Sequence, residues 1–181
     1  VSPTSMCNKP AQAGKDGNLF QHLLMKLILQ SVSSAEVQVY TDESYQECLK
    51  TEKIWTWMLI YFWVGKPDES RSDRKTAIDK FTSKLTTLKL LSSAEGKIEI
   101  PLHEVGSELL VISNFTLFGS YKNGTKIDFS QSGNYGFAKE VYDFFLTNLE
   151  EKEFKVKSWE FWADMLISSI NNGPLNYIFE I

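Results

Sequence analysis

Few side chains of this sequence are of the kinds that usually carry hydrolytic chemistry. The chain has two histidines, His22 and His103, and two cysteines, Cys7 and Cys48, and none stands at a spacing typical of a metal site or of a nucleophile paired with a base. His103 lies in a segment typical of a connecting turn, and both histidines are interpreted as surface residues. The short motifs of serine hydrolases, phosphate loops and zinc peptidases are absent. We therefore expect no metal and no cofactor.

Two polar segments remain as candidates for a site. Residues 113–117 (SNFTL) directly follow the apolar run 108–112, which is typical of a buried strand. By residue type alone, this segment is a strand end whose Phe115 and Leu117 pack in the core. Residues 171–174 (NNGP) lie between two strand patterns and, by residue type alone, form a turn. A structural role and a functional role are both compatible with these residue types.

The composition limits the possible partners. A formal net charge of −4 over 181 residues opposes broad binding to a polyanion, so any nucleic-acid contact must be local. Arg71 and Arg74 are the only arginines. Lys122, Lys126 and Lys139 follow the first polar segment and are candidates for phosphate contacts, although solvated lysines on a hairpin are the alternative interpretation.

The apolar patterns predict one domain built from a sheet and two helices. The run 54–64 is too short to cross a bilayer and is interpreted as a central strand buried on both faces. A capping-box pattern at Ser70 and Asp73 predicts the start of a helix that extends to Leu88, and a second helix is predicted over 134–150. Further strands are predicted from Met25 through Val39 and over 89–91, 97–100, 108–113, 154–157, 162–169 and 175–181. This order indicates a mixed α+β (α/β) fold with a strongly curved mixed β-sheet, or barrel, and helices packed outside it.

Several segments in this order resemble the D-aminoacyl-tRNA deacylase family. They are residues 25–30 (MKLILQ), 32–35 (VSSA), 108–119 (ELLVISNFTLFG) and 172–174 (NGP). The resemblance covers nearly the whole chain from Met25 onward. It implies a D-Tyr-tRNA deacylase-like fold over 25–181 as a single deacylase domain, with 1–24 as a flexible N-terminal extension. It also implies a tRNA-editing hydrolase of the cytoplasm that cleaves the ester of D-aminoacyl-tRNA and of Gly-tRNA.

The resemblance further implies a homodimer with a shared site. In that family the Gly-Pro dipeptide of one subunit, held cis, enters the pocket of the other and excludes L side chains. Gly173 and Pro174 would be this chiral gate, Thr116 would lie near the scissile carbonyl, and Phe115 would form part of the wall for the terminal adenosine. The residues that the resemblance assigns to catalysis or substrate binding are Ser113, Asn114, Phe115, Thr116, Leu117, Asn172, Gly173 and Pro174.

A site without an ionisable base is chemically reasonable for this substrate. The ester that joins an amino acid to tRNA is already activated. A positioned water or ribose 2′-hydroxyl, with backbone N–H groups stabilising the oxyanion, can supply several kcal/mol. We therefore expect Thr116 to act as a positioning group rather than as a covalent nucleophile.

The chain differs from the family pattern at a few positions, and these keep two alternatives open. Ser31 stands where the family has an Arg that fastens the Gly-Pro loop, Asn114 replaces a Gln, and residues 175–176 (LN) replace Val-Thr. Residues 129–137 and 173–181 are similar to a related animal-type branch, whose Gly-Pro bond is trans and which removes small L-amino acids from tRNA. The second alternative is a catalytically silent member that binds a nucleic acid or a protein.

Overall fold

The first strand organises the sheet. In the computed structural model, which describes residues 25–41, 44–121 and 125–181, strand β1 (Lys26–Tyr40) alternates buried and half-buried residues over most of its length. Three strands pair with it antiparallel: β2 (Cys48–Ile54), β3 (Trp57–Trp63) and β8 (Asp164–Glu180). The expected extension 1–24, with Cys7 and His22, and Lys122 lie outside the described residues.

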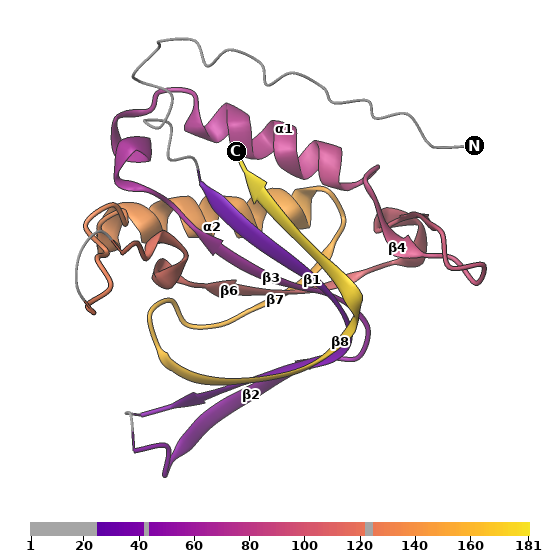
Figure 1. Cartoon of the computed structure of the whole chain (residues 1–181), viewed down its shortest axis with the longest axis horizontal. Coiled ribbons are helices and arrows are strands. Elements are labelled where there is room, and N and C mark those ends of the chain that lie inside the picture. Colours follow the sequence, from indigo (N-terminus) through magenta and orange to yellow (C-terminus); the bar gives the residue numbers. More distant parts are fainter. Residues whose placement is uncertain (1–24, 42–43, 122–124) are drawn as a thin grey trace, which may run out of the picture.

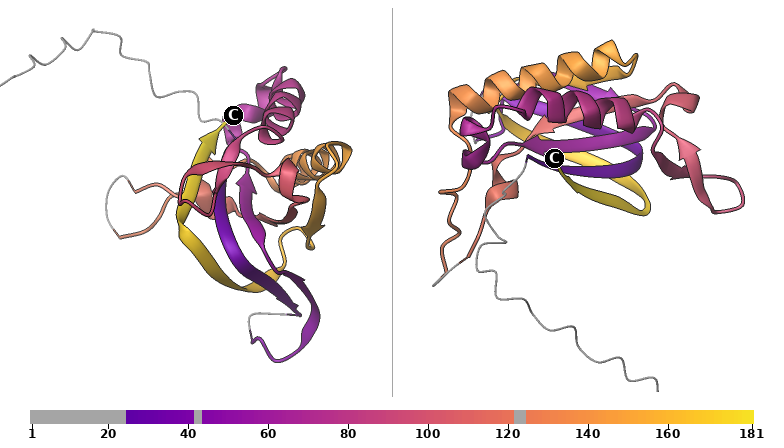
Figure 2. Two further views of the ribbon diagram at one scale, coloured as in Figure 1. Left: turned by 90° about the vertical axis from the view of Figure 1, so that its right-hand side faces the viewer. Right: turned by 90° about the horizontal axis from the view of Figure 1, so that it is seen from above.

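The other half of the sheet is parallel. Strand β6 (Glu108–Ser113) lies between β3 and β7 (Lys155–Ser158) and runs parallel to both. Such pairs need crossover connections, and helices α1 (Arg74–Leu85) and α2 (Tyr135–Glu151) provide them. Both helices lie side by side on one face of the curved sheet (Figures 1 and 2). The first crossover also contains a separate hairpin of β4 (Lys89–Ser92) and β5 (Ile98–Pro101).

The sheet buries apolar side chains on both faces. Along β3, Met58, Ile60 and Phe62 belong to the larger core between the sheet and the helices, where Phe62 stacks on Phe145 of α2 at a centroid distance of 4.5 Å. The alternate residue Leu59 belongs to a second core on the opposite face. No helix within the described ranges is long and apolar enough to span a lipid bilayer.

Most of the predicted elements are confirmed. Strand β6 has the predicted bounds, α2 begins one residue after its N-cap Asn134, and the long first strand is present. The sheet is mixed and strongly curved, with helices outside it, as expected (Figure 2). His103 is exposed in a short 3-10 helix (His103–Val105), which confirms its interpretation as a surface residue.

The predicted single strand over 54–64 is only partly correct. The chain bends at Trp55 and Thr56, and Trp57 has a φ of +119°, so the run is divided between β2 and β3. Ile54 pairs with Ala35 and Trp57 with Val32, so the register with β1 is the same on both sides of the bend. The central position of β3 between β1 and β6 agrees with the prediction.

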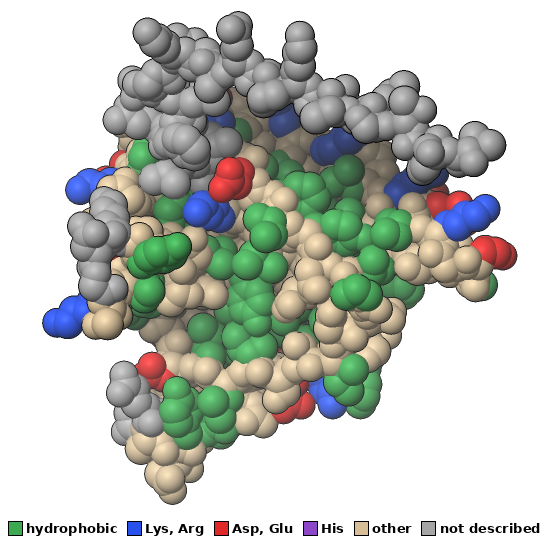
Figure 3. Space-filling view, viewed as in Figure 1, with side chains coloured by type: hydrophobic (Ala, Val, Ile, Leu, Met, Phe, Trp, Pro, Cys, Tyr) green, Lys and Arg blue, Asp and Glu red, His purple; other side chains and the backbone are tan. Residues whose placement is uncertain are grey.

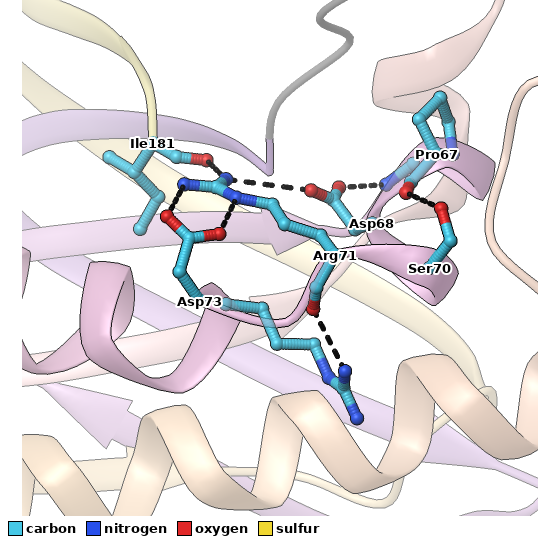
Figure 4. A network of polar contacts seen from close by, with 8 residues as sticks. Pro67, Asp68, Ser70, Arg71, Asp73 and Ile181 are labelled. Atoms are coloured by element: carbon cyan, nitrogen blue, oxygen red, sulfur yellow. Dashed lines mark hydrogen bonds and ion pairs between the residues drawn. The ribbon is translucent and has the colours of Figure 1, made fainter.

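The predicted start of the first helix is wrong in detail. Ser70 ends a separate 3-10 helix (Lys66–Ser70), and α1 begins at Arg74 with Asp73 as its N-cap. The Asp73 side chain makes no capping hydrogen bond. Its carboxylate instead accepts a hydrogen bond from the Arg71 guanidinium at 2.7 Å (Figure 4). Arg71 also lies 3.6 Å from the buried carboxylate of Asp68.

The prediction of two strands separated by a turn at 171–174 is also wrong. Strand β8 runs from Asp164 to Glu180 beside β1, and the chain does not reverse direction. Asn171 pairs with Val32 and Asn176 pairs with Gln30, so residues 172–175 face a single residue of β1. The Asn-Gly-Pro segment therefore forms a bulge within a continuous strand.

Candidate active site

A cavity lies at the carboxyl ends of the three parallel strands. Its volume is about 650 Å³, and its wall includes Tyr61 and Trp63 from the end of β3 and Ser113 from the end of β6. Residues that follow β7 complete it, among them Trp162 and Asp164. Parallel strands commonly place ligand sites at this end, because the loops that follow neighbouring strands converge there.

The SNFTL segment forms a 3-10 turn at the mouth of this cavity. Asn114 caps the turn Phe115–Phe118, and its side-chain oxygen accepts the Thr116 N–H at 3.1 Å and the Thr116 hydroxyl. The Phe115 N–H is the first of this turn and has no acceptor within the described residues. Ser113, Asn114, Phe115 and Thr116 all line the cavity.

Lys26 of β1 makes two contacts with the turn. The Lys26 ammonium donates to the Leu117 carbonyl at 3.4 Å and lies 4.8 Å from the centroid of the Phe118 ring. Leu117 packs against the main core and does not line the cavity, so its predicted place beside the substrate is not supported by its position.

Aromatic rings form one wall of the cavity. Phe115 stacks on Trp162 with centroids 5.1 Å apart and an interplanar angle of 22°. Trp63 lies edge-on to Phe115 at 6.3 Å and is fixed by a 2.6 Å hydrogen bond from its indole N–H to the Ser132 hydroxyl. On the face seen in Figure 3, hydrophobic side chains gather over the middle of the molecule and charged ones lie around its margin.

The phenol of Tyr61 lines the cavity and is neutral at neutral pH. Burial raises the pKa of Tyr61 above its ordinary value, so its phenol remains protonated at neutral pH and can donate a hydrogen bond. Asp164 is the one ionisable carboxylate among the described lining residues. In the part of the chain that the structure describes, no three His, Cys, Asp or Glu side chains gather closely enough to hold a metal ion.

The Gly-Pro bulge is held by a network of amides. Asn171 donates to the backbone carbonyl of Ser31 at 2.7 Å and to the Asn176 side chain at 3.3 Å. Gln30 donates to the same Asn176 oxygen at 3.1 Å. The Gly173-Pro174 peptide bond is cis. At Ser31, where the family pattern has an Arg, the backbone carbonyl accepts the Asn171 side chain.

The predicted site residues therefore fall into two groups. The 113–116 segment is assembled around one cavity, whereas Asn172, Gly173 and Pro174 are exposed and do not line the cavity of their own chain. The lining residues outside both motifs were not predicted: Tyr45, Tyr61, Trp63, Ile112, Trp162, Ala163, Asp164, Met165 and Ile167. The sequence contains two strand-helix-strand patterns, which indicate parallel neighbouring strands. This signal could have placed Tyr61 and Trp162 at the carboxyl ends of those strands, beside the site.

The lysines proposed for phosphate contacts are in different settings. Lys139 forms an ion pair with Asp143 one turn along α2, at 2.6 Å. Lys126 is exposed and has no ion pair within the described residues. Lys126 is therefore the better candidate for a phosphate contact.

Solved structures share this fold. One, titled a probable eukaryotic D-amino acid tRNA deacylase, aligns with a TM-score of 0.72 and 14% identity over 87% of this chain and 99% of the other. Another, the c-Myc DNA Unwinding Element Binding Protein, aligns with a TM-score of 0.69 and 22% identity over 86% of this chain and 98% of the other. These likenesses define the class of fold, a curved mixed sheet of the deacylase type.

The family is defined by the sequence. The family model for D-Tyr-tRNA(Tyr) deacylase matches residues 28–180, and the chain belongs to this family. Similar proteins named D-aminoacyl-tRNA deacylase include one from Thermosipho africanus, 30% identical over 86% of this chain and 97% of the relative. Another, from Bifidobacterium animalis, is 33% identical over 86% of this chain and 96% of the relative. The resemblance and the fold that it implied are thus confirmed.

Proposed function

We propose that this chain is an aminoacyl-tRNA editing hydrolase that cleaves the ester of D-aminoacyl-tRNA. The observation that carries the proposal is the convergence of Ser113, Asn114, Phe115 and Thr116 on one cavity, in a chain whose relatives are named for this activity. The products are a free D-amino acid and tRNA. The cytosol is the location that fits such a substrate.

The reaction needs a positioned water and a stabilised oxyanion. The water oxygen attacks the ester carbonyl carbon, the carbon–oxygen bond to the ribose breaks, and a proton passes from the water to the ribose oxygen. The unbonded Phe115 N–H is a suitable oxyanion donor, because a donor fixed in the backbone needs little reorganisation. The neutral phenol of Tyr61 is a second candidate donor in the same cavity.

Thr116 suits the positioning of the water. Its hydroxyl hydrogen is donated to Asn114, so its oxygen lone pairs are available to accept a hydrogen bond from a water or from the ribose 2′-hydroxyl. The hydrogen bond to Asn114 fixes the orientation of these lone pairs. This role does not require ionisation of Thr116.

We also propose a homodimer in which each Gly173-Pro174 enters the cavity of the partner. Residues 168–174 are all exposed, although they lie within a strand. Ile170 and Ile178, on either side of the bulge, are 64% and 74% exposed. Strand β8 pairs only with β1 among the described strands, and an edge strand with exposed apolar side chains is a surface that a second chain can cover.

The proposal is tested by hydrolysis of defined substrates. Purified protein is incubated with D-Tyr-tRNA, L-Tyr-tRNA and L-Ala on a non-cognate tRNA, and release of the labelled amino acid is followed. We expect release of D-Tyr alone. If L-Ala is released while D-Tyr stays attached to its tRNA, the chain has the activity of the L-selective branch. No release from any substrate at enzyme excess would contradict the deacylase assignment.

A further inference from the structure

A second cavity adjoins the candidate active site. Its volume is about 420 Å³, within the usual range of small-molecule sites, roughly 300–1,000 Å³. The two cavities share Trp162, Ala163 and Asp164, and Tyr135 and Glu160 line the second cavity but not the first. The two cavities are therefore neighbours along residues 162–164, as sites for two successive nucleotides of a single strand would be.

Trp162 is the one aromatic side chain among the described residues that lines both cavities. It is 52% exposed, although Trp is a residue that folded chains usually cover, and it has a φ of +71°, a conformation that favours glycine. Stacking on Phe115 and an edge contact with Tyr135 at 5.6 Å fix its position. An exposed indole held in this way is a suitable platform for a stacked base.

The charges at the second cavity limit what can bind there. Glu160 and Asp164 contribute two carboxylates, and no Lys or Arg lines the cavity among the described residues. A phosphate inside it would be repelled. A base with an exocyclic amino group fits better, because a carboxylate accepts from the amino group of cytosine, whereas uracil presents a carbonyl oxygen at the same place.

We propose that the second cavity binds the base of the cytidine that precedes the terminal adenosine of tRNA. This inference rests on the proposed function, with the terminal adenosine against Phe115 in the first cavity, as the family resemblance implies. The base stacks on the indole of Trp162, and Tyr135, whose ring is inclined at 75° to the indole, contacts the base from the side. Glu160 accepts its amino hydrogen and makes the site selective for cytosine over uracil.

The test compares two substrates that differ at one base. D-Tyr-tRNA is prepared with its natural penultimate cytidine or with uridine at that position, and kcat/KM is measured for each. For the wild type we expect a preference for cytidine on the order of tenfold. Glu160→Gln should bring the ratio of the two kcat/KM values close to one, because the amide can also donate to uracil. Trp162→Leu should lower kcat/KM for both substrates by about tenfold through lost stacking.

A matched control and a binding measurement keep this inference separate from the proposed function. Glu95→Gln changes an exposed carboxylate in the β4–β5 hairpin and should leave the preference unchanged. Labelled single strands ending in CCA or CUA are titrated with each variant, and their Kd values are compared by anisotropy. Equal Kd and equal kcat/KM for the two bases in the wild type would overturn the inference. Binding that discriminates without hydrolysis would support it and contradict the proposed function.

Discussion

The side-chain oxygen of Asn114 accepts two hydrogen bonds from Thr116, one from its N–H and one from its hydroxyl. Through these contacts one residue both caps the 3-10 turn and orients the hydroxyl that faces the cavity. The shorter Asn side chain, in place of the family's Gln, makes both contacts.

Asn114→Ala should therefore reduce activity more than stability. We expect kcat for D-Tyr-tRNA to fall on the order of tenfold, since net hydrogen bonds contribute about 1 kcal/mol each. Asn134→Ala is the matched control, because Asn134 likewise caps a helix, through the N–H of Phe137 at 3.0 Å, but does not line the cavity. Equal loss of kcat in the two variants would contradict a positioning role for Asn114.

Two replacements of Thr116 test the role of its hydroxyl separately from the role of its side-chain shape. Thr116→Val removes the lone pairs that would position the water, and kcat should fall on the order of tenfold or more. Thr116→Ser retains the hydroxyl and should retain most of the activity. Both variants are compared by single-turnover hydrolysis. Full activity of Thr116→Val would exclude Thr116 from the reaction.

Tyr61→Phe tests a neutral donor in the cavity. Because burial raises the pKa of Tyr61 above its ordinary value, its phenol is protonated throughout the neutral range, and no ionisation of Tyr61 should appear in the pH–rate profile in that range. We expect kcat/KM to fall about tenfold without a change in the shape of the profile. Tyr177→Phe is the control, because the Tyr177 hydroxyl donates to Leu90 at 2.8 Å, outside the cavity, and its pKa is also raised by burial.

Gly173→Ala should disrupt the bulge. A β-carbon at this position would collide with the Asn171 side chain and would lie 2.8 Å from the Leu175 nitrogen. Activity should fall on the order of 10²-fold, as expected for displacement of a group that contacts the substrate, while the melting temperature changes little because the segment is exposed. In Gly136→Ala the nearest contact is 3.8 Å, and activity should be unchanged. Wild-type activity in Gly173→Ala would contradict its assignment as a gate.

Arg71→Met should make stability depend on pH. The folded-state pKa of Asp68 is already raised, chiefly by burial, and loss of Arg71 removes an opposing attraction. The charged carboxylate then keeps only the hydrogen bond from the Gly65 N–H at pH 7. Loss of its cationic partner should cost about 2 kcal/mol, below the roughly 3–5 kcal/mol for fully buried pairs because Arg71 is partly exposed. The pKa of Asp73, which Arg71 lowers, also returns toward its ordinary value.

The stability lost in Arg71→Met should change with pH in one direction. A raised pKa means that the folded state takes up a proton more readily than the unfolded state, so the stability deficit of Arg71→Met should shrink as the pH falls from 7 toward 4.5. Urea unfolding at the two pH values measures it. Arg74→Met is the control, because Arg74 donates to the Arg71 carbonyl and pairs with no carboxylate among the described contacts. A deficit that is constant with pH would contradict this account.

The local patterns of the sequence predicted the elements well but not all of their boundaries. Strand β6 follows from a continuous apolar run, and helix α2 follows from apolar residues at helical spacing. The sequence predicts a turn where the structure has the bulge at Asn172, because Asn, Gly and Pro are common in turns and in bulges alike. Only the pairing with β1 on both sides of the segment distinguishes a bulge from a turn. The start of α1 was misplaced because Arg71 engages the carboxylate of Asp73.

The candidate site was predictable where its residues are adjacent in the chain. Ser113 to Thr116 lie together in one polar segment, which stands out after an apolar strand. Tyr61 and Trp162 are separated from that segment by about fifty residues on either side, and each lies in a run of aromatic residues that resembles core. Their place in the wall depends on the parallel pairing of β3, β6 and β7, which periodicity alone does not give.

The pairing of the first strand with the last has a consequence for biosynthesis. β1 lies beside β8 along nearly its whole length, and the Ile181 N–H closes the pairing at the Met25 carbonyl (Figure 1). Contacts between residues so far apart in sequence form slowly, because closing the long loop between them costs entropy before the contacts stabilise it. During translation one edge of β1 therefore remains unpaired until the ribosome has released residues 164 to 180. For that interval the nascent chain presents an exposed strand edge, to which a chaperone can bind.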